Sequence, residues 1–256
     1  MRLHSKIAIF SLTATAVMLI CFITNRSQLT GENIERLLGE SLSSKPVFVS
    51  LKQAFPEWYK GFVRRYAARV LAKQSRHSLS KFVNKEIARF RAANEHLAQR
   101  ASVESLKQLG VARIQLIEHI QENHPEHCSP ALVSGRYDAS KSLVFEGSTQ
   151  IQVMLNATGS SLLAAILDGK LSRTYREPIK QADSDLLIGH LKEAGWKDRQ
   201  IRVLLGVDEP LGVNTTEYCR IGQRLLADLV KWNDKEASAR LLAAVLIAEH
   251  AWAISI

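Results

Sequence analysis

Three histidines and a cysteine crowd one short stretch in the middle of the chain: His119, His124, His127 and Cys128. Imidazole and thiolate groups both bind zinc or copper. However, the spacing matches no structural zinc pattern, and no second half of a ligand set follows. We therefore expect a polar loop after a helix and no metal site, with His124 and His127 as the residual metal candidates.

Carboxylates that could serve as a general acid or base occur at Asp183, Asp185 and Asp198. Aspartates at such positions more commonly cap helices. The sequence contains no G-x-S-x-G, H-E-x-x-H, Walker or G-x-G-x-x-G motif. We therefore expect no cofactor and a non-enzymatic protein. An envelope hydrolase with an unrecognised acidic site is the alternative.

Two of the three cysteines, Cys128 and Cys219, fall in the main part of the chain, whereas Cys21 lies in an apolar run near the start. In an oxidising compartment an isolated pair of cysteines is usually bridged. We predict a Cys128–Cys219 disulfide, on the condition that the domain lies outside the cytoplasm.

The compartment depends on residues 7–24, eighteen residues without a charge, which follow Arg2 and Lys6 and precede Arg26. This length is at the short end of what spans a bilayer. No small-residue cleavage pattern follows the run, so we predict a signal anchor over 1–26, with a cleaved signal peptide as the alternative. The short basic N-tail favours staying inside. We expect a single-pass inner-membrane protein whose domain is periplasmic.

Beyond the anchor, the composition and the periodicity predict an all-α fold. Residues 27–50, with two glycines, the Ser41–Ser44 cluster and Pro46, indicate a tether, in which a short helical stretch is expected over 33–38. Residues 51–256 indicate a multi-helix domain with a possible subdivision near 122–142. Apolar residues recur at three- and four-residue steps from Leu51 to Leu71 and again from Leu79 to Leu97. Further helices are expected over 102–121, over 147–167 with a stop at Asp168–Gly169, and in pairs towards the C-terminus, where 241–256 should be buried.

Residues 51–100 carry twelve Lys or Arg against three Glu, a surplus of nine that equals the net charge of the whole protein, +9. Such a charge is typical of a solvated helix face or of a contact with an anionic surface. The predicted basic contact face consists of Lys60, Arg64, Arg65, Arg69, Lys73, Arg76, Lys81, Lys85, Arg89 and Arg91.

These features together predict a membrane-anchored envelope protein that acts as a non-enzymatic interaction or assembly module. Its expected partners are the inner membrane, through residues 7–24, and either an anionic lipid surface or an acidic envelope protein. We do not expect nucleic acid as a partner, because a translocated domain does not meet it. If the domain were cytoplasmic, a basic nucleic-acid-binding protein would become the alternative.

Overall fold

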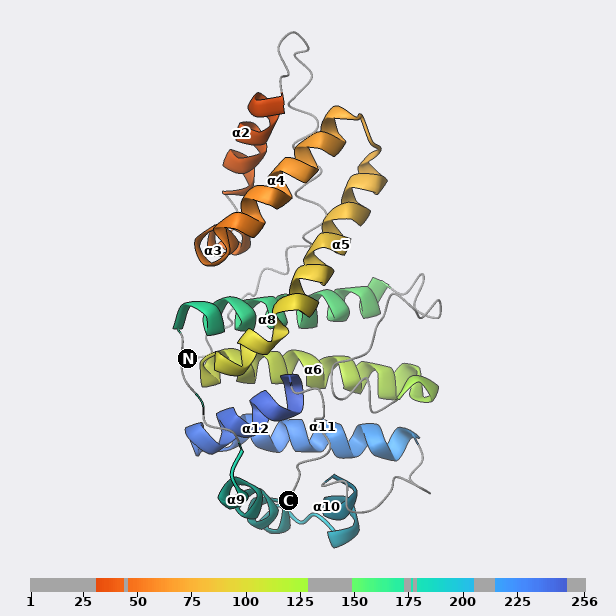
Figure 1. Cartoon of the computed structure of the whole chain (residues 1–256). Helices are drawn as coiled ribbons and strands as arrows, with labels where there is room; N and C mark the ends of the chain where they lie inside the picture. The colour runs from red at the N-terminus through yellow and green to blue at the C-terminus, as the bar shows by residue number, and fades with distance from the viewer. Residues whose placement is uncertain are drawn as a thin grey trace, which may run out of the picture. The chain divides into compact units, whose positions relative to one another are not determined.

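The structure, a computed structural model, describes residues 31–43, 46–128, 149–172, 176, 179–204 and 215–247. In this part of the chain every regular element is helical, as the sequence predicts (Figure 1). The predicted anchor over 7–24 lies outside the described residues. Within the described residues, no helix is long and apolar enough to cross a membrane. The chain divides into two compact units, Met1–Ala93 and Asn94–Ile256. Most of the range near 122–142, where the sequence suggests a subdivision, lies outside the described residues.

The first unit contains α2 (Gly31–Leu42), α3 (Pro46–Ala54), α4 (Pro56–Leu71) and α5 (Arg76–Asn94). Helices α2 and α3 both pack on α4. The helical stretch expected over 33–38 is therefore longer than predicted, because α2 runs over twelve residues and buries Ile34, Leu38 and Leu42 at four-residue steps. Their spacing places them on one face of a helix.

Helix α4 begins later than the apolar periodicity indicated. Leu51 belongs to α3, and the chain breaks at Phe55, which has φ −139° and ψ 61°. Pro56 then takes the first position of α4, where its missing N–H leaves no intrahelical hydrogen bond unmade. The single helix expected from Leu51 onward is therefore two helices joined at a corner.

Aromatic rings hold α4 against α5. Phe62, with 0% exposure, lies at the centre. Its ring is 5.3 Å from that of Trp58, 6.0 Å from Tyr66 and 6.1 Å from Phe82 on α5. Aromatic pairs at these separations contribute beyond the area they bury. The hairpin is consequently a well-packed support for the charged residues on its outer surface.

The turn between α4 and α5 places a lysine in an unfavourable backbone conformation. Lys73 has φ 52°, and its N–H donates to Val70 O at 2.9 Å while Gln74 N–H donates to Arg69 O at 3.2 Å. These two bonds form a Schellman C-cap, in which glycine is the usual residue at the left-handed position. Gly195, with φ 77°, occupies the same position after α9 (Gln181–Glu193).

Lys73→Gly is therefore expected to stabilise the protein by about 0.5–1 kcal/mol, because glycine lacks the steric penalty that a side chain meets at positive φ. Urea unfolding of the two proteins would measure the difference. A loss of stability on this substitution would mean that the Lys73 side chain contributes more free energy to the turn than its positive φ costs.

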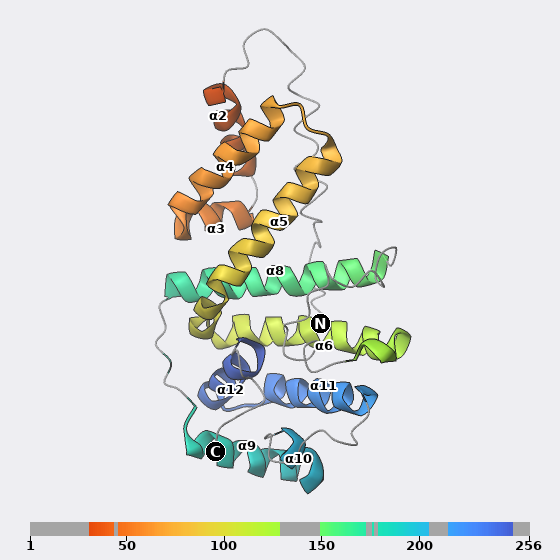
Figure 2. The ribbon, with the colours of Figure 1, turned by 45° about the vertical axis from the view of Figure 1, so that its right-hand side comes forward.

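The second unit is organised around α6 (Val103–Asn123), which packs against α8 (Thr149–Ser172), α11 (Thr215–Lys231) and α12 (Lys235–Ile247). Helices α8, α6 and α11 lie side by side in both views, with α9 and α10 (Asp198–Leu204) beyond α11 (Figure 2). The 3₁₀ helix η2 (Glu95–Arg100) packs on α8 and α12, and η3 (Pro125–His127) follows α6. Helix α12 is buried from Leu241 to Ile247, as predicted for this part of 241–256, and the remainder lies outside the described residues.

Helix α8 does not stop at Asp168–Gly169 as predicted but continues to Ser172. Gly169 is needed for close packing: a Cβ built there would lie 2.9 Å from the Leu97 carbonyl carbon and 3.1 Å from Ala101 N. Asp168 is used outside its own helix, because its Oδ2 accepts hydrogen bonds from Ser102 N (2.7 Å) and Ser102 Oγ (2.6 Å) at the start of α6. The Asp-Gly pair is thus a helix–helix contact rather than a helix end.

Candidate functional site

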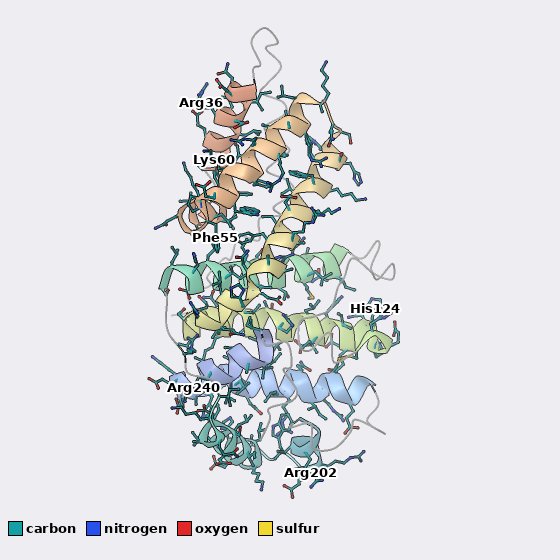
Figure 3. All side chains as sticks on the ribbon, viewed as in Figure 1. Arg36, Phe55, Lys60, His124, Arg202 and Arg240 are labelled. Carbon is teal, nitrogen blue, oxygen red and sulfur yellow. A yellow bond between two sulfur atoms is a disulfide. The ribbon has the colours of Figure 1, made fainter. Side chains whose placement is uncertain are left out.

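The predicted basic contact face lies on the α4–α5 hairpin and is mostly exposed. Helix α4 carries the first four of its residues and α5 the last five, with Lys73 in the turn between them. Arg69 and Arg91 are half-buried, and the other eight residues are exposed. Figure 3 marks Lys60 on α4. The exposure agrees with a solvated charged face, and the contact itself stays a prediction.

Three of the arginines are engaged within the hairpin. Arg65 Nε donates to Glu86 Oε2 at 3.1 Å, and Arg65 Nη2 donates to the same oxygen. Arg89 Nη1 lies 3.6 Å from Glu86 Oε1. Arg69 donates to Gln74 Oε1 at 3.0 Å and places its guanidinium carbon 4.4 Å from the centre of the Phe82 ring. Arg65 and Arg69 thus join α4 to α5, whereas Arg89 pairs with Glu86 within α5. All three are less available for an external partner.

The remaining cations are better suited to an external contact. Burial lowers the pKa of Arg91, which sets that half-buried residue apart from the exposed ones. Within the described part of the chain, five exposed side chains of the face have neither a hydrogen bond nor an ion pair: Lys60, Arg64, Lys73, Lys81 and Lys85. A cation without an internal carboxylate keeps its full charge for an anionic partner. The sequence could not separate these five from the three engaged arginines, because Glu86 is 21 residues from Arg65.

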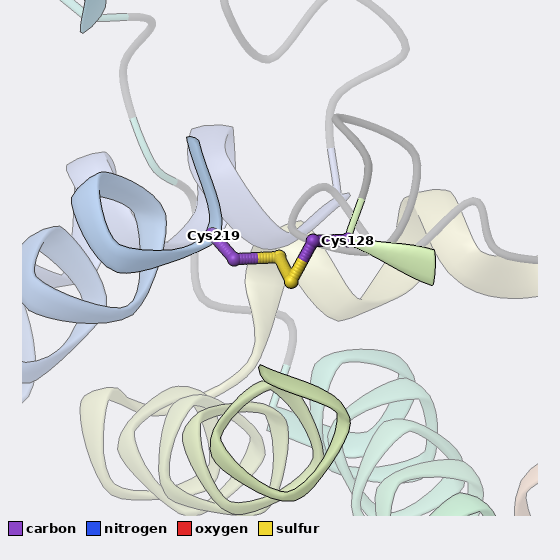
Figure 4. The surroundings of a disulfide bond; sticks show 2 residues. All are labelled: Cys128 and Cys219. Carbon is purple, nitrogen blue, oxygen red and sulfur yellow. A yellow bond between two sulfur atoms is a disulfide. The ribbon is translucent and has the colours of Figure 1, made fainter. Parts of the chain in front are cut away.

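The predicted cysteine pair is joined in the structure. Cys128, directly after η3, and Cys219, in the second turn of α11, form a disulfide with a Cα–Cα distance of 5.6 Å (Figure 4). Both residues are buried, at 1% and 0% exposure. The bond closes a sequence separation of 91 residues and links the end of α6 to the start of α11.

The histidine cluster does not gather a ligand set. The disulfide removes the Cys128 thiolate from the candidates. His124 Nδ1 and His127 Nε2 lie 3.8 Å and 3.3 Å from Glu126 Oε1, while their rings are 6.2 Å apart. Among the residues that the structure describes, no group of three or more His, Cys, Asp or Glu side chains could hold a metal ion.

Two carboxylates are buried in the described structure, and each is paired with arginine. Glu86 contacts Arg65 and Arg89, whereas Asp183 accepts hydrogen bonds from Arg240 Nε (2.9 Å) and Nη2 (2.6 Å). The bonds from Arg240 lower the pKa of Asp183.

The other aspartates considered for acid–base chemistry have surface roles. Asp185 accepts a hydrogen bond from Gln181 at 3.1 Å, and Asp198 lies 3.9 Å from Lys192 Nζ. Asp183 was predicted to cap the helix through Leu191, but the N-cap of α9 is Lys180. Asp183 contributes from the third helical position instead, because its Oδ2 accepts the Lys180 N–H at 3.0 Å. The same side chain therefore starts α9 and ties it to α12 through Arg240.

Sequence reasoning missed Asp168 as the partner of Ser102, which is 66 residues away. Burial alone would raise the pKa of Asp168, but hydrogen bonds from Ser102, Ser172 and Ser105 lower it to about 2 from an ordinary value of 3.8. As the pH falls, the unfolded chain therefore takes up a proton at Asp168 before the folded chain does. The contribution of the ionised Asp168 to the free energy of unfolding is complete above about pH 4 and is lost as the pH falls towards 2.

We expect this loss to amount to about 1 kcal/mol, because solvent screens the half-exposed carboxylate. Asp168→Asn removes the titrating group, so the stability gap between wild type and variant should narrow by that amount between pH 5 and pH 2.5. Denaturant unfolding at both pH values measures it. An equal gap at the two pH values would show that the serines do not select the ionised form.

No known protein family matches this chain, and no curated protein or solved structure is similar to it.

Proposed function

We propose that the chain is a single-pass inner-membrane protein whose helical units lie in the periplasm and serve as a non-enzymatic interaction or assembly module. The observation that carries this proposal is the buried Cys128–Cys219 disulfide. Structural disulfides persist in oxidising compartments such as the periplasm and are rare in the cytosol. The uncharged run over 7–24 supplies the means of attachment.

The surface chemistry supports contact rather than catalysis. The exposed cations on α4 and α5 favour an anionic partner, either lipid headgroups or an acidic envelope protein. The buried carboxylates in the described residues are engaged by arginine, which supports a structural role for both.

The attachment is tested by membrane extraction of the full chain. We expect it to stay with the membrane pellet after alkaline carbonate treatment. Two charges within the apolar run, Ala14→Arg with Val17→Arg, should release it, because each arginine at the centre of a span costs about 2.5–3.5 kcal/mol on insertion scales. Ala14→Leu is the matched control and should stay in the pellet. Release of the wild-type chain would contradict the proposal.

A further inference from the structure

We propose that the tip of the α4–α5 hairpin, residues 71–76, docks on the anionic lipid headgroups of the membrane that holds the chain. This inference rests on the proposed function, because it takes residues 7–24 as the membrane attachment. It assigns anionic lipid as the partner of Lys73 and Arg76, the part of the basic contact face that lies at the tip.

The first support is the point at which the chain enters the first unit. Helix α2 begins at Gly31, and a Cβ built on Gly31 would lie 3.8 Å from Leu71 Cδ1. The start of α2 therefore lies beside the end of α4. In both views this end of α2 and the α4–α5 turn lie at the same end of the unit, and α3 lies at the opposite end (Figures 1 and 2).

The second support is the length of chain that precedes α2. Six residues, 25–30, separate the apolar run from Gly31. Even fully extended, the seven Cα–Cα steps from Thr24 to Gly31 reach only about 25 Å. If residues 7–24 lie in the bilayer, the end of the unit that carries Gly31 and Leu71 stays within about that distance of the headgroups. The opposite end is separated from it by the length of α4, about 24 Å, so it is not held near the membrane in the same way.

The third support is the chemistry of the tip. Lys73 projects from the turn with no described partner and keeps a left-handed backbone conformation where glycine would fit better. Strain retained at one residue points to a use for its side chain. Arg76 is exposed next to it, Lys81 lies in the following turns of α5, and Leu71 is 43% exposed. Cations around an exposed apolar side chain suit the headgroup region.

Two acidic residues limit the strength of this contact. Glu32 and Glu35 lie at the start of α2, at the same end of the unit. The tip would therefore bind free vesicles weakly on its own. Attachment through residues 7–24 makes the contact intramolecular, and a raised effective concentration lets a weak contact form. An acidic protein partner would need no such position next to the membrane, so the geometry favours lipid.

The test uses the purified full chain in a Cys21→Ser background, reconstituted into vesicles of phosphatidylcholine alone or with about a third phosphatidylglycerol. A fluorophore is placed at the exposed tip through Ala72→Cys or, as the positional control, at the far end of the unit through Gln53→Cys. Quenching by lipids with spin-labelled headgroups reports proximity to the membrane surface.

We expect quenching at position 72 to be about twofold stronger in anionic than in neutral vesicles, to exceed that at position 53, and to fall at high salt. Lys73→Glu with Lys81→Glu should at least halve the quenching at position 72 in anionic vesicles. The matched pair Lys52→Glu with Lys60→Glu makes the same change in charge at the other end of the unit and should leave it unchanged. In the labelled Ala72→Cys protein without charge substitutions, quenching at high and low salt tests the contact by itself.

The outcomes separate the two proposals. A chain that fails to float with the vesicles contradicts the membrane attachment itself. A chain that floats but shows equal quenching at positions 72 and 53, or equal quenching in neutral and anionic vesicles, overturns the docking inference and leaves the attachment standing. An equal effect of the two charge-reversal pairs also overturns it, because the contact would then not lie at the tip.

Discussion

Gly169→Ala is expected to destabilise the second unit by about 3 kcal/mol or more, although alanine favours helix by about 1 kcal/mol over glycine. The added Cβ would meet backbone atoms of Leu97 and Ala101, not the end of a flexible side chain. Either α8 or η2 must therefore move, and the hydrogen bonds of Asp168 to Ser102 would be strained with it. Thermal and urea unfolding of the full chain would measure the loss.

Two other glycines serve as matched controls. Gly189→Ala on α9 meets nothing within 4 Å, so it should stabilise the protein by about 0.5–1 kcal/mol through helix propensity. Gly110→Ala meets the Val230 side chain at 2.8 Å, which can rotate, and its cost should fall between the two. A Gly169→Ala protein as stable as Gly189→Ala would refute the close packing of α8 on η2.

Removing the disulfide with Cys128→Ala and Cys219→Ala should cost about 2–4 kcal/mol, because the bond restricts the unfolded chain over a long loop. Wild-type protein treated with a reductant under unfolding conditions should lose a similar amount. The double variant should be insensitive to the reductant. Denaturant unfolding with and without reductant compares all four samples.

The same experiment bears on the compartment. A wild-type stability that does not respond to reductant would show that the two thiols are not bridged in the folded protein, and the main support for a periplasmic location would be lost. Burial of both sulfur atoms means that the reductant must act on the unfolded or opened protein. The protein must therefore be reduced before it is refolded and measured.

Much of the fold could be predicted from the sequence, because apolar residues at helical spacing mark buried faces. The helix over 103–123 and the buried start of 241–256 were predicted within a few residues. The errors occur where one residue type has two structural uses. Gly169 resembles a helix stop but permits close packing. Residues 27–50 were predicted as a tether with one short helical stretch, but they contain α2 and the start of α3, and both helices pack on α4.

The candidate site could be predicted only in outline. The surplus of positive charge over 51–100 was visible at once, and the disulfide followed from having two cysteines in the main part of the chain. The sequence could not show that Arg65 and Arg89 share Glu86, or that Arg69 lies over Phe82. It also could not show that Gly31 lies beside Leu71. These contacts join residues on different helices, which periodicity within one helix does not reveal.

The proposed periplasmic location of the helical units can be measured by cysteine accessibility in intact cells. Because Cys128 and Cys219 are buried, new cysteines should report instead: Ala92→Cys on α5 and Ala164→Cys on α8, both at exposed positions, in a Cys21→Ser background. A membrane-impermeant maleimide is added to cells whose outer membrane alone has been permeabilised. We predict that both positions are labelled before the inner membrane is broken. Labelling that requires lysis of the inner membrane would place the units in the cytoplasm and contradict the proposed periplasmic location.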